Sequence, residues 1–304
     1  MLFFNRKNSI TFNEASKLYL EYCELELELS PSSIYEYSKT LRWTMDTLGD
    51  LRMEKFKEEH LLKLKQDYIK KNLSPNTKAH NFSVIRNLLR FCHSELNLKV
   101  MDADKVKRPR IPRHKVEYLT EGELRQFYSS IGNRSLRDLR FRALFSVLFS
   151  TGCRISEALN LKIEGIDFVN REAMIVGKGN KERKVYFTEW SNQCIREYLE
   201  RRGYKYKFVF VAESKSHGRW DRNDAQRNFR NYLKKSGLDK KCTAHTLRRS
   251  FATTLLKKGV GLGQIQILLG HSDLQTTSRH YLGVLSDDEA KKAHEKHMDM
   301  SNWL

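Results

Sequence analysis

The sequence predicts a mainly α-helical protein of two domains, an N-terminal four-helix domain and a C-terminal α+β domain with a small β-sheet. Three observations predict this class. The chain has 304 residues, which suits two domains of ordinary size. It contains only 4 Pro and 15 Gly, so residues that interrupt helices are scarce. Apolar residues recur at helical spacing through most of the chain, and only about 173–187 has a strand-like pattern.

The composition excludes several classes of protein. Hydrophobic residues make up 39% and charged residues 31%, which argues against a disordered chain. No run of about 18 apolar residues predicts a membrane-spanning helix, and the first residues do not form a secretory signal. Lys and Arg number 56 against 37 Asp and Glu, a formal charge of +19. Such an excess indicates a polyanionic partner, and a nucleic acid is the first candidate.

The five cysteines are odd in number and form no C-x-x-C pair. They therefore disfavour a disulfide framework or a zinc site, and we expect a reducing, cytoplasmic location. We also expect no cofactor, because no carboxylate cluster or Cys/His spacing suggests a metal.

The N-terminal domain, residues 1–104, is expected to contain four helices. Ser30-Pro31 and Ser74-Pro75 each suit a helix start, with proline in the first turn, and Gly49 suits a helix end. The expected helices span about 11–29, 31–48, 58–71 and 75–92.

Residues 105–117 are predicted to be a basic linker. The segment from Lys105 to Lys115 contains six basic residues and no acidic one, and Pro109 and Pro112 favour an extended backbone. An extended basic segment can follow a phosphate backbone. The residues expected to contact DNA are Lys107, Arg108, Arg110, Arg113 and Lys115.

The C-terminal domain, residues 118–304, is expected to start with a helix capped by Thr120 and Glu123. Two strand-like runs, 173–176 and 183–187, flank a turn with the sequence G-K-G-N-K-E. The remaining expected helices span about 136–150, 189–202, 222–236 and 245–258, followed by shorter helices to about 280 and a polar helix from 286.

Five short motifs in this domain carry residues able to act on a phosphate. They are T-G-C-R-I-S-E-A-L with Arg154 and Glu157, V-G-K-G-N-K-E-R-K-V with Lys178, A-H-T-L-R-R-S-F-A-T with His245 and Arg248, L-G-H-S-D with His271, and T-T-S-R-H-Y-L with Tyr281. Each motif alone is compatible with an ordinary surface or core position. Together, the arginines, lysine and histidines suit the oxygens of a phosphate, and a tyrosine can serve as a nucleophile.

These motifs, in this order, resemble those of the tyrosine recombinases, the phage integrase family, especially its short Xer-like members. The resemblance covers nearly the whole chain. It implies an N-terminal core-binding (SAM-like) domain and a C-terminal catalytic domain. It also implies site-specific DNA recombination (integration, resolution or excision) by cleavage and rejoining through a 3′-phosphotyrosyl intermediate, without metal.

The resemblance assigns a role to each site residue. Arg154 and Arg248 would hold the scissile phosphate, and His271 would hydrogen-bond it. Lys178 would act as the general acid, His245 would assist proton transfer, and Tyr281 would be the nucleophile. Glu157 matches an acidic position that supports the site.

One feature departs from the family pattern. Tyr281 follows His271 by 281 − 271 = 10 residues, one more than is usual. On a helix, one residue turns a side chain by about 100°, so a kink or loop would have to absorb it. No later tyrosine exists, and Tyr281 remains the candidate.

The family also implies double-stranded DNA with a specific recombination site as partner and a tetramer on two sites. The apolar residues of 286–304 are expected to dock on a neighbouring protomer rather than on their own domain. A topoisomerase of type IB and a non-catalytic DNA-binding regulator on the same fold are the alternatives.

Overall fold

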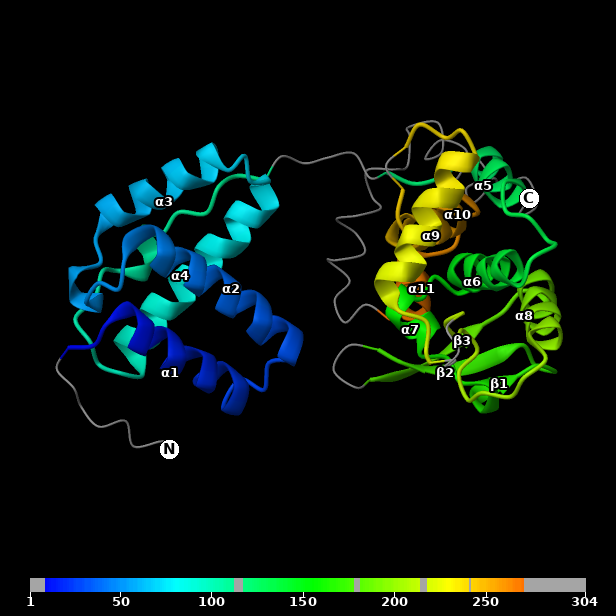
Figure 1. The fold of residues 1–304 in the computed structure, drawn as a ribbon, viewed down its shortest axis with the longest axis horizontal. Coiled ribbons are helices and arrows are strands. Elements are labelled where there is room, and N and C mark those ends of the chain that lie inside the picture. Colours follow the sequence, from blue (N-terminus) through cyan, green and yellow to red (C-terminus); the bar gives the residue numbers. More distant parts are fainter. Residues whose placement is uncertain (1–8, 112–116, 178–180, 214–217, 241, 271–304) are drawn as a thin grey trace, which may run out of the picture. The chain divides into compact units, whose positions relative to one another are not determined.

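The computed structural model describes residues 9–111, 117–177, 181–213, 218–240 and 242–270. The chain divides into two compact units, 1–114 and 115–304 (Figure 1). The prediction of a mainly helical chain with one small sheet is confirmed. The finer division into 1–104, 105–117 and 118–304 stays a prediction.

Four α-helices form the first unit. Thr11 caps the first helix together with Glu14, while Ser30 and Ser74 each accept a hydrogen bond from the backbone N–H three residues on. The elements are α1 (Phe12–Leu25), α2 (Pro31–Leu48), the 3₁₀ turn η1 (Met53–Lys55), α3 (Glu58–Lys70), α4 (Pro75–Ser94) and the 3₁₀ turn η2 (Ala103–Lys105).

The first helix ends earlier than the sequence suggested. We expected it to reach Leu29, but α1 ends at Leu25, and Glu28 adopts a positive φ of 46°. Residues 24–28 are exposed, so the apolar side chains of Leu25 and Leu27 find no core to hold a further turn. A positive φ is incompatible with an α-helix of L-residues, and the chain turns there toward α2.

All four helices of the first unit contribute to its core, and α3 does so through Leu61, Leu64 and Tyr68. The core extends beyond the helices, because Val106 is buried and Lys105 forms an ion pair with Glu58 at 2.8 Å. From Lys107 to Ile111 the chain has no regular secondary structure, and Lys107, Arg108 and Arg110 are exposed.

The second unit is built around the long helix α6, which packs against α8, α10, α7 and strand β3. Thr120 and Glu123 form the expected capping box at the start of α5. The helices are α5 (Glu121–Ser129), α6 (Leu136–Thr151), α7 (Ile155–Leu159), α8 (Glu189–Arg202), α9 (Arg222–Lys235), α10 (Ala244–Lys257) and α11 (Leu262–Leu269).

A three-stranded antiparallel sheet in the order β1-β2-β3 follows the 3₁₀ turn η3 (Ile163–Gly165). The sequence predicted β2 and β3 but not β1, which has only two residues. The strands are β1 (Ile166–Asp167), β2 (Glu172–Val176) and β3 (Glu182–Tyr186). In the register of β2 and β3, Ala173 lies opposite Val185 and Ile175 opposite Arg183. Because Ala173, Ile175 and Val185 are buried, Arg183 lies on the inner face of the sheet.

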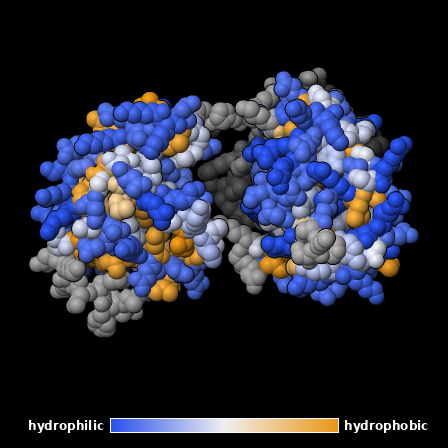
Figure 2. Space-filling model, viewed as in Figure 1, coloured by the Kyte–Doolittle hydropathy of each residue, from blue (hydrophilic) through white to orange (hydrophobic). Residues whose placement is uncertain are grey.

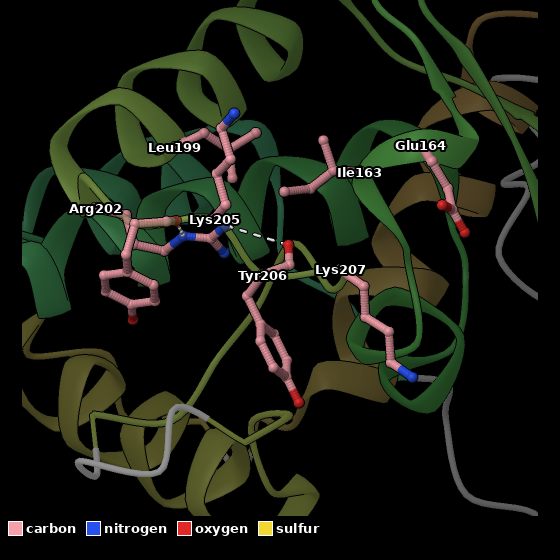
Figure 3. Close-up of a pocket in the computed structure, with 8 residues that line it drawn as sticks. Ile163, Glu164, Leu199, Arg202, Lys205, Tyr206 and Lys207 are labelled. Carbon is pink, nitrogen blue, oxygen red and sulfur yellow. Dashed lines mark hydrogen bonds between the residues drawn. The ribbon is translucent and has the colours of Figure 1, made fainter.

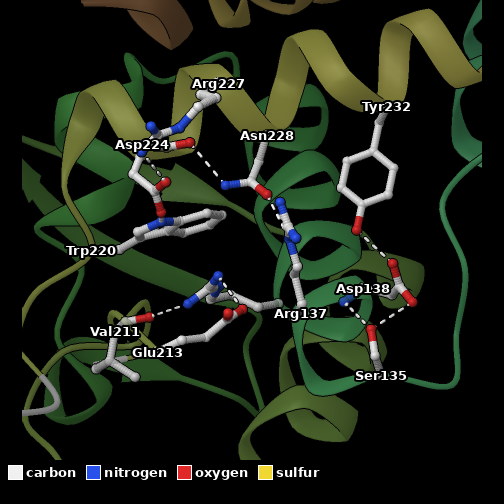
Figure 4. A network of polar contacts seen from close by, with 11 residues as sticks. Ser135, Arg137, Asp138, Val211, Glu213, Trp220, Asp224, Arg227, Asn228 and Tyr232 are labelled. Atoms are coloured by element: carbon white, nitrogen blue, oxygen red, sulfur yellow. Dashed lines mark hydrogen bonds and ion pairs between the residues drawn. The ribbon is translucent and has the colours of Figure 1, made fainter. Parts of the chain in front are cut away.

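A buried arginine, Arg140, joins α6 to the segment before α9, and Figure 4 labels its partners Val211, Glu213 and Trp220. The guanidinium carbon of Arg140 lies 3.9 Å from the ring centroid of Trp220. Arg140 also donates to the carbonyl oxygen of Val211 and to Glu213, both at 2.7 Å. The indole N–H of Trp220 donates to Asp224 at 2.6 Å, at the start of α9. A guanidinium with cation–π and charge-assisted contacts can be buried at low cost, so this network holds α9 on the core.

In the part of the chain that the structure describes, no helix has the length and apolar character needed to cross a membrane. Hydrophilic residues cover much of the visible face of each unit (Figure 2).

Candidate active site

Arg154 begins helix α7 directly after a sharp turn. Helix α6 ends at Thr151 and is capped by Gly152, whose φ of +62° lies in the left-handed region. The backbone N–H of Arg154 donates to Oε2 of Glu157, and its guanidinium Nη1 donates to Oε1, both at 2.8 Å. The Arg154 side chain is 37% exposed, whereas that of Glu157 is 4% exposed. The buried carboxylate of Glu157 therefore fixes the position of Arg154, while part of the Arg154 guanidinium remains exposed to solvent.

A second arginine binds the same carboxylate. Arg183 of β3 donates from Nη1 to Oε1 of Glu157 at 3.2 Å and from Nη2 to Oε2 at 2.8 Å. Burial by itself would raise the pKa of the Glu157 carboxyl, but hydrogen bonds from Arg183 and Arg154 outweigh it. The pKa of Glu157 consequently lies below its ordinary value, and the group is ionised at neutral pH.

Arg248 is the most enclosed arginine of this group, with 2% of its surface exposed. Its Nη1 donates to the carbonyl oxygen of Gly152 at 2.9 Å, and its Nη2 donates to that of Leu269 at 2.7 Å. Burial lowers the pKa of Arg248 to about 10, and repulsion from Arg154 adds to this effect. The residue therefore stays charged at neutral pH and ties α10 to the ends of α6 and α11.

We call Arg154, Glu157, Arg183 and Arg248 the arginine cluster. Its three guanidiniums and one carboxylate carry a net charge of +2. Fixed positive charge with outward-facing N–H donors at Arg154 is what a phosphodiester anion requires. The neighbouring Cys153 is not a competing nucleophile, because burial raises the pKa of its thiol to about 11.

The cluster also reaches the segments that carry the other predicted residues. A methyl group at Gly177 would lie 3.3 Å from Nη1 of Arg183 and 3.4 Å from Oε1 of Glu157. One at Gly270 would lie 2.7 Å from Cδ of Arg183, which requires glycine there. The N–H of Gly177 bonds to the carbonyl of Lys181 at 2.8 Å, closing the turn. The structure thus brings the chain just before Lys178 and just before His271 to the arginine cluster.

The predicted site residues fall into three groups. Arg154 and Arg248 come together in the cluster, and His245 lies in the first turn of α10, exposed, three positions before Arg248. Lys107, Arg108 and Arg110 are described and exposed in the first unit. The remaining predicted residues, which lie outside the described part of the chain, are Lys178, His271, Tyr281, Arg113 and Lys115.

Arg183 was not among the site residues predicted from the sequence. The signal was present, because Arg183 lies two positions before the apolar Val185 and so shares its inward face of an amphipathic strand. A charged residue at an inward position predicts a buried partner of opposite charge.

A cavity of about 490 Å³ lies elsewhere in the second unit (Figure 3). Its walls come from η3, the end of α8 and the following loop. Arg202 shapes that loop by donating to the carbonyls of Tyr204, Tyr206, Phe208 and Val209. The lining residues include no member of the arginine cluster, and they are Ile163, Glu164, Leu199, Arg202, Tyr204, Lys205, Tyr206 and Lys207.

The fold and the arginine cluster define a helical protein with an anion site suited to a phosphodiester. The phage integrase family matches residues 117–287, more than half of the chain. Tyrosine recombinase XerC of Proteus mirabilis is 30% identical over 276 residues, covering 88% of each protein. Tyrosine recombinase XerD of Lacticaseibacillus casei is 30% identical over 271 residues, covering 85% of this chain and 90% of that protein.

Solved structures agree with these relatives. The crystal structure of XerA recombinase is 27% identical, covers 94% of this chain and 98% of its own, and has a TM-score of 0.52. The Tn1549 transposon integrase in complex with circular intermediate DNA has a TM-score of 0.77 at 19% identity, covering 94% and 99%. The chain belongs to the phage integrase family. It is an Xer-like tyrosine recombinase, a site-specific DNA recombinase that cleaves and rejoins DNA strands.

Proposed function

We propose that the arginine cluster holds the scissile phosphate of a recombination site while Tyr281 attacks it. The observation that carries this proposal is the pairing of the partly exposed Arg154 with the buried Glu157. The carboxylate fixes the guanidinium without occupying all of its donors, so Arg154 can bind two phosphate oxygens. The buried charge of Arg248 adds to the positive potential behind it.

Cleavage in this proposal is a transesterification at phosphorus. The hydroxyl oxygen of Tyr281 bonds to phosphorus, the bond between phosphorus and the 5′ oxygen breaks, and Lys178 gives that oxygen a proton. His245 assists removal of the phenol proton, and His271 hydrogen-bonds a phosphate oxygen. Rejoining is the reverse attack by a 5′-hydroxyl, and the phosphotyrosyl bond conserves the energy of the broken one.

Charge stabilisation by arginine and lysine would let this chemistry proceed without a metal or nucleotide cofactor. The basic chain at 105–117 would lie along the phosphate backbone, with Lys107, Arg108, Arg110, Arg113 and Lys115 contacting DNA. The exposed positions of Lys107, Arg108 and Arg110 support this role.

We further propose that four protomers assemble on two DNA sites in the cytoplasm, where the DNA is. A lambda integrase tetramer bound to a Holliday junction has a TM-score of 0.71 at 17% identity, which supports a shared fold. Residues 286–304 would dock on a neighbouring protomer. The Xer relatives favour recombination over a topoisomerase of type IB or a non-catalytic regulator.

A half-site suicide substrate tests the nucleophile. Its short strand diffuses away after cleavage, so the covalent adduct accumulates. We expect the adduct on Tyr281 by peptide mapping, and we expect Tyr281→Phe to bind DNA normally but to form none. An adduct on a neighbour such as Thr277 or Ser278, or one that persists in the variant, would overturn the assignment.

A further inference from the structure

Arg183 and Arg154 both bond to the carboxylate of Glu157, and the bonds of Arg183 limit those that Arg154 can form. The two terminal nitrogens of Arg183, Nη1 and Nη2, bond to the two carboxylate oxygens, an end-on fork that only arginine can make. The Arg183 side chain is 14% exposed and that of Glu157 is 4% exposed, so the pair is nearly closed to water. A buried pair of this kind has one strongly preferred geometry.

This fork leaves Arg154 a limited share of the carboxylate. In the described part of the chain, the Arg154 guanidinium donates one hydrogen bond, from Nη1 to Oε1 of Glu157. If Arg183 were absent, each carboxylate oxygen would regain a free lone pair, even with the backbone N–H of Arg154 still bonded to Oε2, and the Arg154 guanidinium could then form a two-pronged bond. Such a bond would use donors of Arg154 that now face outward, and it would draw the guanidinium inward.

The surroundings of Arg183 also fix its position. Its stem lies against Gly270, where even a methyl group would come within 2.7 Å of Cδ, and its head lies against Gly177. Its strand pairs with β2, where Arg183 lies opposite Ile175. A rigid sheet therefore determines where the fork lies.

We propose that Arg183 is a positioning residue for DNA cleavage: its two-pronged bond to Glu157 keeps the guanidinium of Arg154 turned outward toward the scissile phosphate. The inference rests on the proposed function, in which Arg154 binds that phosphate. Arg183 acts through Glu157, because both of its terminal nitrogens bond to that carboxylate and its side chain is only 14% exposed.

The test measures single-turnover cleavage of the suicide substrate by the full chain. Arg183→Gln removes the charge, and Arg183→Lys keeps the charge but cannot form the fork. We expect cleavage to slow by about 10-fold or more in both, with DNA affinity within about twofold of wild type. Lys184→Gln is the matched control, because the neighbouring Lys184 forms an exposed ion pair with Glu172 at 2.6 Å across the same two strands. The control should cleave as wild type does.

Two further measurements separate positioning from a general loss of structure. Substrate with a 5′-bridging sulfur should not restore Arg183→Gln, because Arg154 acts on the non-bridging oxygens rather than on the leaving group. In an Arg154→Lys background, Arg183→Gln should slow cleavage by less than about threefold, since residues that act through one another are not additive.

The outcomes discriminate clearly. Normal cleavage by Arg183→Gln and Arg183→Lys, full rescue by the bridging sulfur, or an undiminished effect in the Arg154→Lys background would each overturn the inference. Loss of DNA binding that matches the loss of cleavage would also overturn it, by indicating a purely structural role. The proposed function fails by a different result, namely an Arg154→Ala variant that cleaves as fast as wild type.

Discussion

Arg248 donates a hydrogen bond from Nη1 to the carbonyl oxygen of Gly152, at 2.9 Å, across 96 positions of sequence. The bond fastens α10 to the turn after α6, and that turn leads directly into Arg154. Arg248, which the sequence predicts to bind the phosphate, thus also connects two helices of the domain. The same turn admits no side chain, because a methyl group at Gly152 would lie 2.4 Å from the ring of Phe251.

Gly152→Ala should therefore destabilise the protein more than an ordinary glycine replacement. The positive φ costs an L-residue about 1–2 kcal/mol, and crowding against Phe251 adds about 1–3 kcal/mol. Gly203→Ala is the matched control, because Gly203 has a φ of +72° with no heavy atom within 4 Å of the added carbon. Urea denaturation measures both free energies of unfolding. Equal losses in the two variants would show that the contact with Phe251 has no energetic weight.

Glu157→Gln should reduce the dependence of stability on acid pH. Because the folded pKa of Glu157 is depressed, its contribution is fully present above the unfolded value of about 4.3 and is lost as pH falls through the folded pKa. The thermal midpoint of wild type should thus drop more steeply below about pH 4 than that of the variant. Glu182→Gln, at an exposed position of β3, is the control and should follow wild type. Parallel curves for wild type and Glu157→Gln would contradict the role of this carboxylate.

Lys178→Ala should slow cleavage far more than it weakens DNA binding. A positioned general acid contributes about 10²–10⁴-fold. Substrate with a 5′-bridging sulfur should restore the rate, because a thiolate leaves without a proton. This response is opposite to the one expected of Arg183→Gln, so the two variants serve as controls for each other. If sulfur fails to rescue Lys178→Ala, the acid is another residue, and His245 is the next candidate.

Replacement of Arg108, Arg110 and Arg113 by Ala should weaken binding to every DNA sequence alike. Each lost phosphate contact lowers the slope of log K against log salt by about 0.9, so the triple variant should lose roughly 3. Filter binding between 50 and 200 mM salt, roughly the range over which such slopes are resolved, measures this. The control is a second triple variant, with Lys63, Lys65 and Lys70 on α3 replaced by Ala, which removes the same three positive charges at another place. An equal effect of both triple variants would mean that net charge, rather than the linker, sets affinity.

Deletion of residues 286–304 should leave single-site binding intact and impair complexes that join two sites. In the proposed assembly, the apolar side chains of this segment dock on a neighbouring protomer, and one protomer bound to a single site does not need that contact. Gel-shift with one and with two sites separates these steps. Normal paired-site complexes would mean that the segment packs on its own protomer.

Much of the local structure follows from the sequence by itself. Thr120 with Glu123 predicts a helix start, because a side-chain oxygen satisfies the backbone N–H groups there, and the structure has the same capping box at Thr11 and Glu14. Ser30 and Ser74, each before a proline, act in the same way. These features depend on neighbours within about four residues, and they can therefore be predicted from the sequence alone.

The tertiary structure alone decided how the charged residues meet. Nothing within four residues of Arg183 indicates Glu157, which lies 26 positions away, or Gly270, which lies much farther along the chain. The burial of Arg248 likewise depends on the carbonyls of Gly152 and Leu269, and the early end of α1 depends on the lack of a core beneath Leu25 and Leu27. Burial and ion pairing are properties of segments distant in sequence, so only the packing of α6, α7, β3, α10 and α11 against one another determines them.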